Sequence, residues 1–216
     1  MKVGIVGGTG EIGEGMALRL SQRHEVFIGS RERDKAQTCS LSCRTLLGSL
    51  ELPCRVQGCD NQEAVDSAEI VILAVPFPHA ANTISTLKGF GGKIVVSPIN
   101  PIQRAEYFFH APPPEGSAGL MVKRLLPADA RLCVAFNNIA ANRWRDLEKP
   151  LRYSVAVCGD DPTAKERVME LAGSVPELEA FDAGPLAVSP MVESLTPLLL
   201  NIGKYSRMKD VGVRFL

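Results

Sequence analysis

The chain begins with a pattern of hydrophobic and polar positions that predicts a strand, a tight turn, a helix and a second strand. Residues 2–7 form a short apolar run, residues 11–22 carry apolar side chains at helical spacing, and residues 25–29 are apolar again. A βαβ unit of about 30 residues produces this succession. We therefore predict two parallel strands joined by a helix.

The same alternation continues to about residue 136. The run from Ile70 to Val75 is apolar at every position, which is typical of a strand covered on both faces of a parallel sheet. Asp60 or Asn61 is a candidate N-cap of a short helix. Five prolines fall within 98–117, which we interpret as a loop. Further strands are expected at 54–58, 93–97 and 131–136, and further helices at 32–49, 79–88 and 117–126.

A shorter α/β pattern follows residue 145. It predicts a strand at 153–158, a helix at 162–173, a strand near 178–182 and a mainly helical segment at 189–209. We therefore expect an α/β protein with a doubly wound parallel Rossmann sheet at 1–145 and a small capping α/β domain at 146–216. Ligands of such sheets bind outside the carboxyl ends of the strands.

Composition restricts the class of partner. The formal net charge is zero, so no overall positive field favours nucleic acid or anionic lipid. No uncharged apolar stretch approaches the ~20 residues of a membrane span, and we interpret Met191–Ile202 as a buried helix. The N-terminal run is too short for a signal sequence. These features favour a cytoplasmic protein.

The chain has six cysteines, and their spacings fit no common zinc framework. Cys39-x3-Cys43 and Cys54-x4-Cys59 are the two closely spaced pairs. We interpret all six as free thiols of a reducing compartment and predict no metal site.

The first turn has the spacing Gly-x-Gly-x-x-Gly between the first strand and the first helix. In dinucleotide-binding proteins these glycines permit a tight turn, a close approach of the backbone to the diphosphate and close helix–strand packing. The helix N-terminus offers unpaired N–H groups and a positive dipole end. The turn therefore predicts a diphosphate site at Gly8, Thr9, Gly10, Glu11, Ile12 and Gly13.

The end of the second strand distinguishes NADP from NAD. An NAD site usually carries an acidic residue there, whereas this chain has Gly29, Ser30 and Arg31. We expect Gly29 to leave space, and Ser30 and Arg31 to contact the 2′-phosphate, with Lys35 adding charge one turn later. Arginine suits phosphate because its guanidinium is a planar fork of donors. We expect the neighbouring Glu32 to point outward.

Several segments together resemble the NADPH-dependent coenzyme F420 reductase family (F420H2:NADP oxidoreductase). The resemblance covers nearly the whole chain, and its most specific part lies outside the nucleotide-binding pattern. The segments are Gly7-Gly8-Thr9-Gly10, Gly29-Ser30-Arg31, Val95-Val96-Ser97-Pro98, Ala135-Phe136-Asn137-Asn138-Ile139, Val157-Cys158-Gly159-Asp160-Asp161, Asp182-Ala183-Gly184-Pro185-Leu186 and Glu193-Ser194-Leu195-Thr196-Pro197-Leu198-Leu199-Leu200-Asn201.

This resemblance implies direct hydride transfer between NADP(H) and the deazaflavin ring of coenzyme F420, in an enzyme that is usually a homodimer. It also assigns roles by position. Thr9, Ser30, Arg31 and Lys35 would hold the NADP phosphates, and Val75, Pro76 and His79 would line the adenosine and ribose side. Asn137, Ile139 and Ala140 would surround the nicotinamide, and Ser194, Thr196 and Leu200 would help form the deazaflavin pocket.

Within this scheme, the cofactors carry the chemistry and the protein sets their placement. We expect Ile139 to set the separation of the two rings, and Ser194, Thr196 or water to relay the proton that F420 takes up. The chain departs from some archaeal members at Asn137, where they carry histidine. It also has Pro190-Met191 where some carry arginine, so Lys204, Arg207, Lys209 and Arg214 are the alternative partners of the anionic F420 tail.

Two alternatives remain open. The segments Ala135-Phe136-Asn137 and Gly159-Asp160 also resemble the cytosolic domain of membrane ferric reductases, which suggests a soluble NADPH-dependent flavin or ferric reductase. A non-catalytic, NADP-binding redox sensor is the second. The C-terminal segment around Ser194 and Thr196 argues against a sensor, because a sensor needs no pocket for a second ring.

Overall fold

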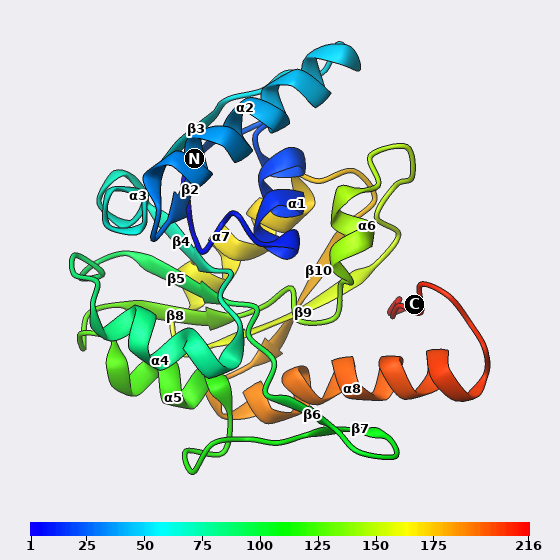
Figure 1. The fold of residues 1–216 in the computed structure, drawn as a ribbon. Helices are drawn as coiled ribbons and strands as arrows, with labels where there is room; N and C mark the ends of the chain where they lie inside the picture. Colours follow the sequence, from blue (N-terminus) through cyan, green and yellow to red (C-terminus); the bar gives the residue numbers. More distant parts are fainter.

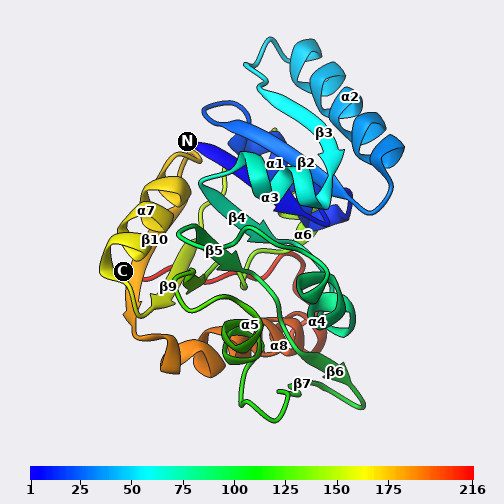
Figure 2. The same ribbon diagram turned by 90° about the vertical axis from the view of Figure 1, so that its left-hand side faces the viewer.

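A computed structural model describes all residues, 1–216, and shows a main eight-stranded sheet with helices on both faces (Figure 1, Figure 2). The eight strands lie in the order β10-β9-β8-β5-β4-β1-β2-β3. Their bounds are β1 (Lys2–Val6), β2 (Glu25–Ser30), β3 (Val56–Asp60), β4 (Ile70–Leu73), β5 (Ile94–Ser97), β8 (Arg131–Val134), β9 (Ser154–Gly159) and β10 (Glu179–Gly184). The helices are α1 (Glu11–Leu20), α2 (Arg33–Ser49), α3 (Asn61–Ser67), α4 (Phe77–Ser85), α5 (Ala118–Leu125), α6 (Ala141–Arg145), α7 (Pro162–Gly173), the short 3-10 helix η1 (Leu186–Val188) and α8 (Ser189–Tyr205).

Six strands that are adjacent in the sheet run parallel to one another, which confirms the doubly wound arrangement. In their spatial order they are β8, β5, β4, β1, β2 and β3. The sheet is not parallel throughout, because β9 runs antiparallel to β8 and only β10 is parallel to β9. After β8 the chain stays at the carboxyl edge of the sheet, forms the short helix α6, and turns back into β9. No crossover returns it to the opposite edge, so the next strand runs the other way.

The sheet separates two hydrophobic cores. Along β4, Ile70 and Ile72 pack into the core beneath α1, α2, α6 and α7, while Val71 and Leu73 pack into the core beneath α3, α4, α5 and α8. Side chains of a strand alternate between its faces, so burial of both faces requires an apolar residue at every position. This accounts for the unbroken apolar run in the sequence.

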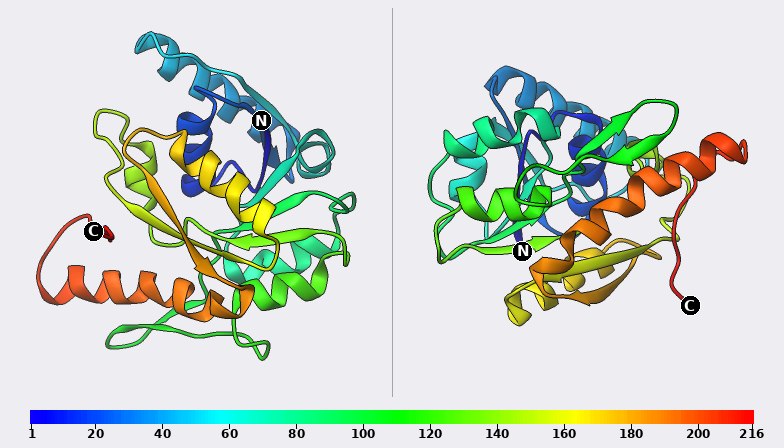
Figure 3. Two further views of the ribbon diagram at one scale, coloured as in Figure 1. Left: turned by 180° about the vertical axis from the view of Figure 1, so that it is seen from behind. Right: turned by 90° about the horizontal axis from the view of Figure 1, so that it is seen from below.

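The proline-rich segment 98–117 is not a plain loop, and that expectation is wrong. It contains a two-stranded antiparallel hairpin, β6 (Ile102–Arg104) and β7 (Phe108–His110), which lies beside α8 (Figure 3). The Asn201 side chain of α8 bonds both backbone groups of Phe108, accepting its N–H at 2.9 Å and donating to its carbonyl at 2.7 Å. A partner so distant in sequence leaves no local signal.

Helix α8 is less buried than the sequence suggested. Val192, Glu193 and Leu199 face the protein, whereas Met191 and Leu198 are more than half exposed. By length and composition alone the segment Leu186–Tyr205 could cross a membrane, with a mean hydropathy of 1.3. In this structure Glu193 of α8 accepts hydrogen bonds from α5, and Asn201 bonds the hairpin, so the helix packs against the rest of the protein.

Candidate active site

A cleft of about 630 Å³ lies at the carboxyl ends of the parallel strands. It is formed mainly by the turns after β1, β2, β4, β5 and β8, with further residues from α3, α4 and α8. Its predicted lining residues are Thr9, Gly10, Glu11, Ile12, Ser30, Arg31, Lys35, Val75, Pro76, His79, Asn137, Ile139, Ala140 and Thr196.

The glycine turn begins one residue earlier than the motif suggests. Gly7 has a φ of +71°, so the left-handed turn residue is Gly7 and not Gly8. A Cβ on Gly8 would lie 2.8 Å from the carbonyl oxygen of Ile5, and a Cβ on Gly13 would lie 2.5 Å from the Cα of Gly8. Gly8 and Gly13 therefore allow the strand, the turn and α1 to touch, and both lie behind the cleft surface.

The N-terminus of α1 faces the cleft and has no side-chain cap. Gly10 is the N-cap residue, and no side chain accepts a hydrogen bond from the first turn. The first N–H groups of a helix have no intrahelical acceptor and lie at the positive end of its dipole. A Cβ on Gly10 would meet only the oxygen of Gly7, at 3.6 Å, so the cleft side is open. The turn thus fits a diphosphate.

Gly29 has a different role from the one expected. A Cβ there would lie 2.8 Å from Oδ1 of Asn61, so the space that Gly29 leaves is filled by Asn61 and not by a nucleotide. Asn61 is buried, and its Oδ1 accepts the backbone N–H of Gly7 at 3.1 Å. Gly29 therefore lets α3 brace the glycine turn.

The end of β2 carries a mixed set of charges. Ser30 is buried and its Oγ accepts the N–H of Glu32 at 3.2 Å, which leaves the hydroxyl proton free to donate. Arg31 is exposed on the cleft, as expected. Glu32 does not simply point away: it lines the cleft and its carboxylate pairs with Nζ of Lys35 at 2.6 Å. Both side chains are mostly exposed, and exposed ion pairs contribute little free energy to stability. Lys35 can therefore leave Glu32 and bind another anion at little cost.

The opposite end of the cleft is organised around Asn137. Its side-chain Nδ2 donates to the carbonyl of Ile99 at 3.2 Å and to Oδ1 of Asn100 at 3.1 Å. Its backbone carbonyl accepts from Nδ2 of Asn100 at 2.9 Å and from Oγ1 of Thr196 at 2.5 Å. Oδ1 of Asn137 is buried without a partner. The preceding Phe136 has a φ of +67°, a strained conformation for a side chain of this size.

Asn137 also has one polar atom without a partner at this end of the cleft. A buried acceptor without a donor costs about 1–3 kcal/mol, and the residue that carries this oxygen lines the cleft. Ile139, 4% exposed, lies on the same turn and presents an apolar surface beside it. An amide-bearing ring fits this combination of acceptor and apolar wall.

Two residues expected in the second-ring pocket are not brought to the cleft. The hydroxyl of Ser194 donates to the carbonyl of Pro190 within its own helix at 2.6 Å. Leu200 is 41% exposed and is likewise absent from the lining. Thr196, between them in sequence, does reach the cleft, because it lies on the face of α8 that meets the turn after β8.

Several lining residues had no individual role predicted from the sequence. Asn100 and Ile102 lie in the segment interpreted as a loop, and Asn61 was considered only as a helix cap, a role that Asp60 takes by accepting the N–H of Glu63. Only the rule that ligands bind at the carboxyl ends of strands pointed to this region. The lining residues to which the sequence assigned no role in the site are Gly7, Glu32, Asn61, Leu73, Ala74, Phe77, Thr83, Pro98, Ile99, Asn100, Ile102 and Ala141.

Helix α8 is positioned by a buried carboxylate. Glu193 is fully buried and accepts the N–H groups of Ala118 and Gly119, each at 2.9 Å, at the N-terminus of α5. His110 on the hairpin lies 3.2 Å from the same carboxylate. Burial raises the pKa of Glu193, and the two backbone donors and His110 oppose that shift. Glu193 thus joins α8, α5 and the hairpin away from the cleft surface.

Comparison with known proteins identifies the family of this chain. The family described as NADP oxidoreductase, coenzyme F420-dependent, matches residues 2–101. The F420-dependent NADP reductase of Methanocaldococcus jannaschii is 34% identical over 99% of this chain and 97% of its own length. A solved structure from Arthrobacter sp. FB24, to which F420-dependent NADP reductase activity has been ascribed, superposes with a TM-score of 0.80 at 22% identity and covers 100% of this chain and 99% of its own.

The similarity to a metalloreductase covers a smaller part of that relative. Metalloreductase STEAP3 of Rattus norvegicus is 29% identical over 98% of this chain, but the match spans only 40% of that protein. The methanogen reductase matches end to end at higher identity. Nearly full-length identity above 30%, together with a fold, a glycine turn and an α8 segment of the expected kind, places this chain in the family of coenzyme F420-dependent NADP oxidoreductases.

Proposed function

We propose that this protein transfers a hydride directly between NADP(H) and the deazaflavin ring of coenzyme F420, and that both bind in the cleft described above. One observation carries the proposal. The cleft continues from the phosphate-binding turn to an end lined by Ile99, Asn100, Ile102, Asn137, Ile139 and Thr196, none of which is ionisable. Hydride transfer needs placement of two rings and no acid or base at the reacting carbons.

The nucleotide would lie along the end of the cleft that carries the glycine turn. Gly8, Gly10 and Gly13 shape the turn, and the N–H groups of Glu11 and Ile12 at the start of α1 would bind the diphosphate, with Thr9 beside them. Ser30, Arg31 and Lys35 would bind the 2′-phosphate. Val75, Pro76 and His79 would line the adenosine and ribose side, where all three reach the cleft.

The nicotinamide would lie against Asn137, Ile139 and Ala140. Its carboxamide N–H is the donor that the buried Oδ1 of Asn137 lacks. Transfer requires donor and acceptor carbons within about 3–3.5 Å. Ile139 is the residue we assign to hold that separation, because it is almost fully buried and its turn is fixed by the Asn100–Asn137–Thr196 bonds.

We do not assign proton relay to the hydroxyl groups of Ser194 and Thr196, which the sequence suggested as candidates. Thr196 reaches the cleft, but its proton is donated to the carbonyl of Asn137. Ser194 donates to its own helix. We therefore assign Thr196 chiefly to positioning Asn137, and water is the proton source we favour for the deazaflavin ring. Ser194 has no contact that supports a catalytic role.

The division into residues 1–145 and 146–216 is proposed as a functional one. Residues 1–145 would bind NADP(H), and residues 146–216 supply Thr196 and the helix that closes the far end of the cleft. Structurally the second part continues the first, because β9 and β10 extend the same sheet. The basic residues Lys204, Arg207, Lys209 and Arg214 are the candidates for the anionic F420 tail.

We further propose a cytoplasmic homodimer, as the family resemblance implies. The exposed apolar side chains of α8, Met191, Leu198 and Tyr205, support an association of two copies. Sedimentation equilibrium tests the proposal. A mass of about twice 23.3 kDa is expected, and a monomer at micromolar concentration would contradict it.

The activity is tested by mixing the protein with NADPH and F420 and following the deazaflavin absorbance, with FMN and FAD in parallel. We expect turnover of F420 and little reduction of either flavin. Reduction of FMN alone would favour the soluble flavin reductase, and tight NADPH binding without any turnover would favour the redox sensor. Either result would overturn the proposal.

A further inference from the structure

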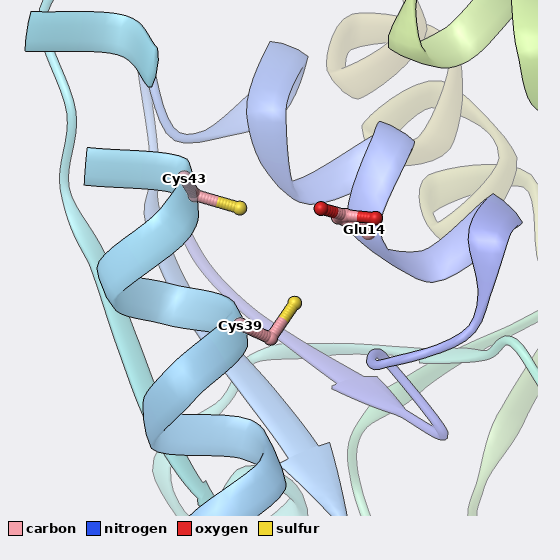
Figure 4. Close-up of side chains that lie close together, drawn as sticks. All are labelled: Glu14, Cys39 and Cys43. Carbon is pink, nitrogen blue, oxygen red and sulfur yellow. The ribbon is translucent and has the colours of Figure 1, made fainter. Parts of the chain in front are cut away.

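A second cluster of reactive side chains lies outside the cleft, between α1 and α2. Glu14 on α1 and Cys39 and Cys43 on α2 point into the same space (Figure 4). One oxygen of Glu14 and the two sulfur atoms all lie within 4.8 Å of one another. Cys43 is buried, while Glu14 and Cys39 are half-buried, so the cluster is open on one side. The cleft chemistry uses none of these three residues.

The helix geometry of the two cysteines favours a bridging atom over a disulfide. Residues four apart on a helix have Cβ atoms about 5–6 Å apart, whereas a disulfide requires about 3.5–4.5 Å. Cys39 and Cys43 lie inside the 17-residue helix α2, which would have to distort to bring them closer. A metal ion at about 2.3 Å from each sulfur spans the separation without that distortion.

A basic side chain lies beside the cluster. Arg145 on α6 lies 3.4 Å from Oε2 of Glu14. A partner of this kind orients a ligating carboxylate, and its positive charge offsets the excess negative charge of two thiolates and a carboxylate on a divalent cation.

We propose that Glu14, Cys39 and Cys43 bind one thiophilic divalent cation of the zinc class, with Arg145 orienting Glu14. Binding displaces the two thiol protons to solvent and forms two metal–sulfur bonds and one metal–oxygen bond, with water in the remaining position. Sequence spacing alone excluded a common zinc framework, because the third ligand comes from another helix. This site is independent of the proposed hydride transfer.

The position of this site suggests what binding would do. It joins α1, whose N-terminus would meet the diphosphate of the nucleotide, to α2, which begins just after Arg31. Arg145 adds α6, whose N-terminal residues also line the cleft. A cation held here would stabilise the mutual placement of the three helices, and a ligand that binds only the folded protein raises its unfolding temperature.

Cadmium titration of the reduced full-length protein tests the proposal, because thiolate-to-cadmium charge transfer absorbs in the ultraviolet. We expect one cadmium ion per chain, release of two protons, and competition by zinc. Cys39→Ser should abolish the absorbance. Arg145→Gln should retain it with an affinity lower by about 10- to 100-fold. Cys54→Ser, which removes a half-buried thiol outside the trio, is the matched control and should titrate like the wild type.

Circular dichroism of each variant, with its NADPH affinity, separates loss of the site from loss of the fold. Cys39→Ser is preferred to Cys43→Ser because Cys39 is half-buried. A folded wild-type protein that gives no charge-transfer absorbance would overturn the proposal. So would an equal loss of signal in Cys54→Ser, or a mass lower by two hydrogens on mild oxidation that joins Cys39 to Cys43.

Discussion

The two ends of the cleft are built in different ways. The phosphate end, named for the diphosphate that we propose binds there, is built from backbone: Gly7, Gly8 and Gly13 allow close contacts, and the N-terminus of α1 has no side-chain cap. The far end is a network of side chains from distant segments, in which Asn100 and Thr196 hold Asn137. The first end depends on the absence of side chains at its glycines, and the second depends on hydrogen bonds between side chains.

Substitution of Gly13 should have the largest effect on the backbone end. The Cβ of Gly13→Ala would meet the backbone of Gly8 at 2.5 Å, which no side-chain rotation relieves. We expect NADPH binding to weaken by about 3 kcal/mol or more, roughly a hundredfold or beyond. Gly48→Ala is the control, because its Cβ would meet nothing within 4 Å. Isothermal titration should show binding lost in the first variant and kept in the second, and equal affinities would refute the account.

Removal of Glu193 should have the largest effect on the side-chain end. Glu193→Ala leaves the buried N–H groups of Ala118 and Gly119 without an acceptor. We expect the free energy of unfolding to fall by about 2–3 kcal/mol, measured by urea denaturation. Glu193→Gln keeps one acceptor oxygen and should lose less. An Ala variant as stable as the wild type would show that this carboxylate does not hold α8.

Arg31→Ala tests whether the phosphate end distinguishes NADP from NAD. A hydrogen bond to a charged group contributes about 1.5–3 kcal/mol, so NADPH affinity should fall about 10- to 100-fold while NADH affinity changes little. Glu32→Gln frees Lys35 from its pair and should tighten NADPH binding slightly. If Arg31→Ala weakens both nucleotides equally, Arg31 does not read the 2′-phosphate.

The smallest of these effects is expected for Thr196→Val. This change removes one hydrogen bond to the carbonyl of Asn137 and keeps the shape of the side chain. We expect kcat to fall by a factor of about 5–10, equivalent to about 1 kcal/mol, with little change in the KM for NADPH. Ser194→Ala is the matched control, since that hydroxyl bonds its own helix. A loss of the same size in both variants would remove the distinction between them.

The same contrast explains what could be predicted from the sequence. The βαβ pattern and the glycine turn are local, so the sequence predicted the first strand, the turn and the first helix. Ser30 and Arg31 line the cleft because β2 ends there. Asn201 bonding to Phe108, and Asn100 bonding to Asn137, join residues far apart in sequence, and the hairpin that carries Phe108 was taken for a loop. The role of Gly29 on β2 was also missed, because its neighbour Asn61 comes from α3, about 30 residues along the chain.

The reversal of β9 has a similar origin. Its sequence predicted a strand correctly, but its direction depends on where the chain lies after β8. The loop and the short helix α6 keep the chain at the carboxyl edge, and no pattern of apolar positions records that path. Direction and long-range side-chain contacts are therefore the properties that required the structure.

The central claim is that hydride passes directly between two rings placed in one cleft. Reaction of F420 with NADPH deuterated at the transferred position of the nicotinamide tests it most directly, with the product examined by mass spectrometry and NMR. The account predicts that the deuterium appears on the carbon of reduced F420 and not in the solvent. Washout of the label into water, or its retention on the oxidised nucleotide, would contradict it.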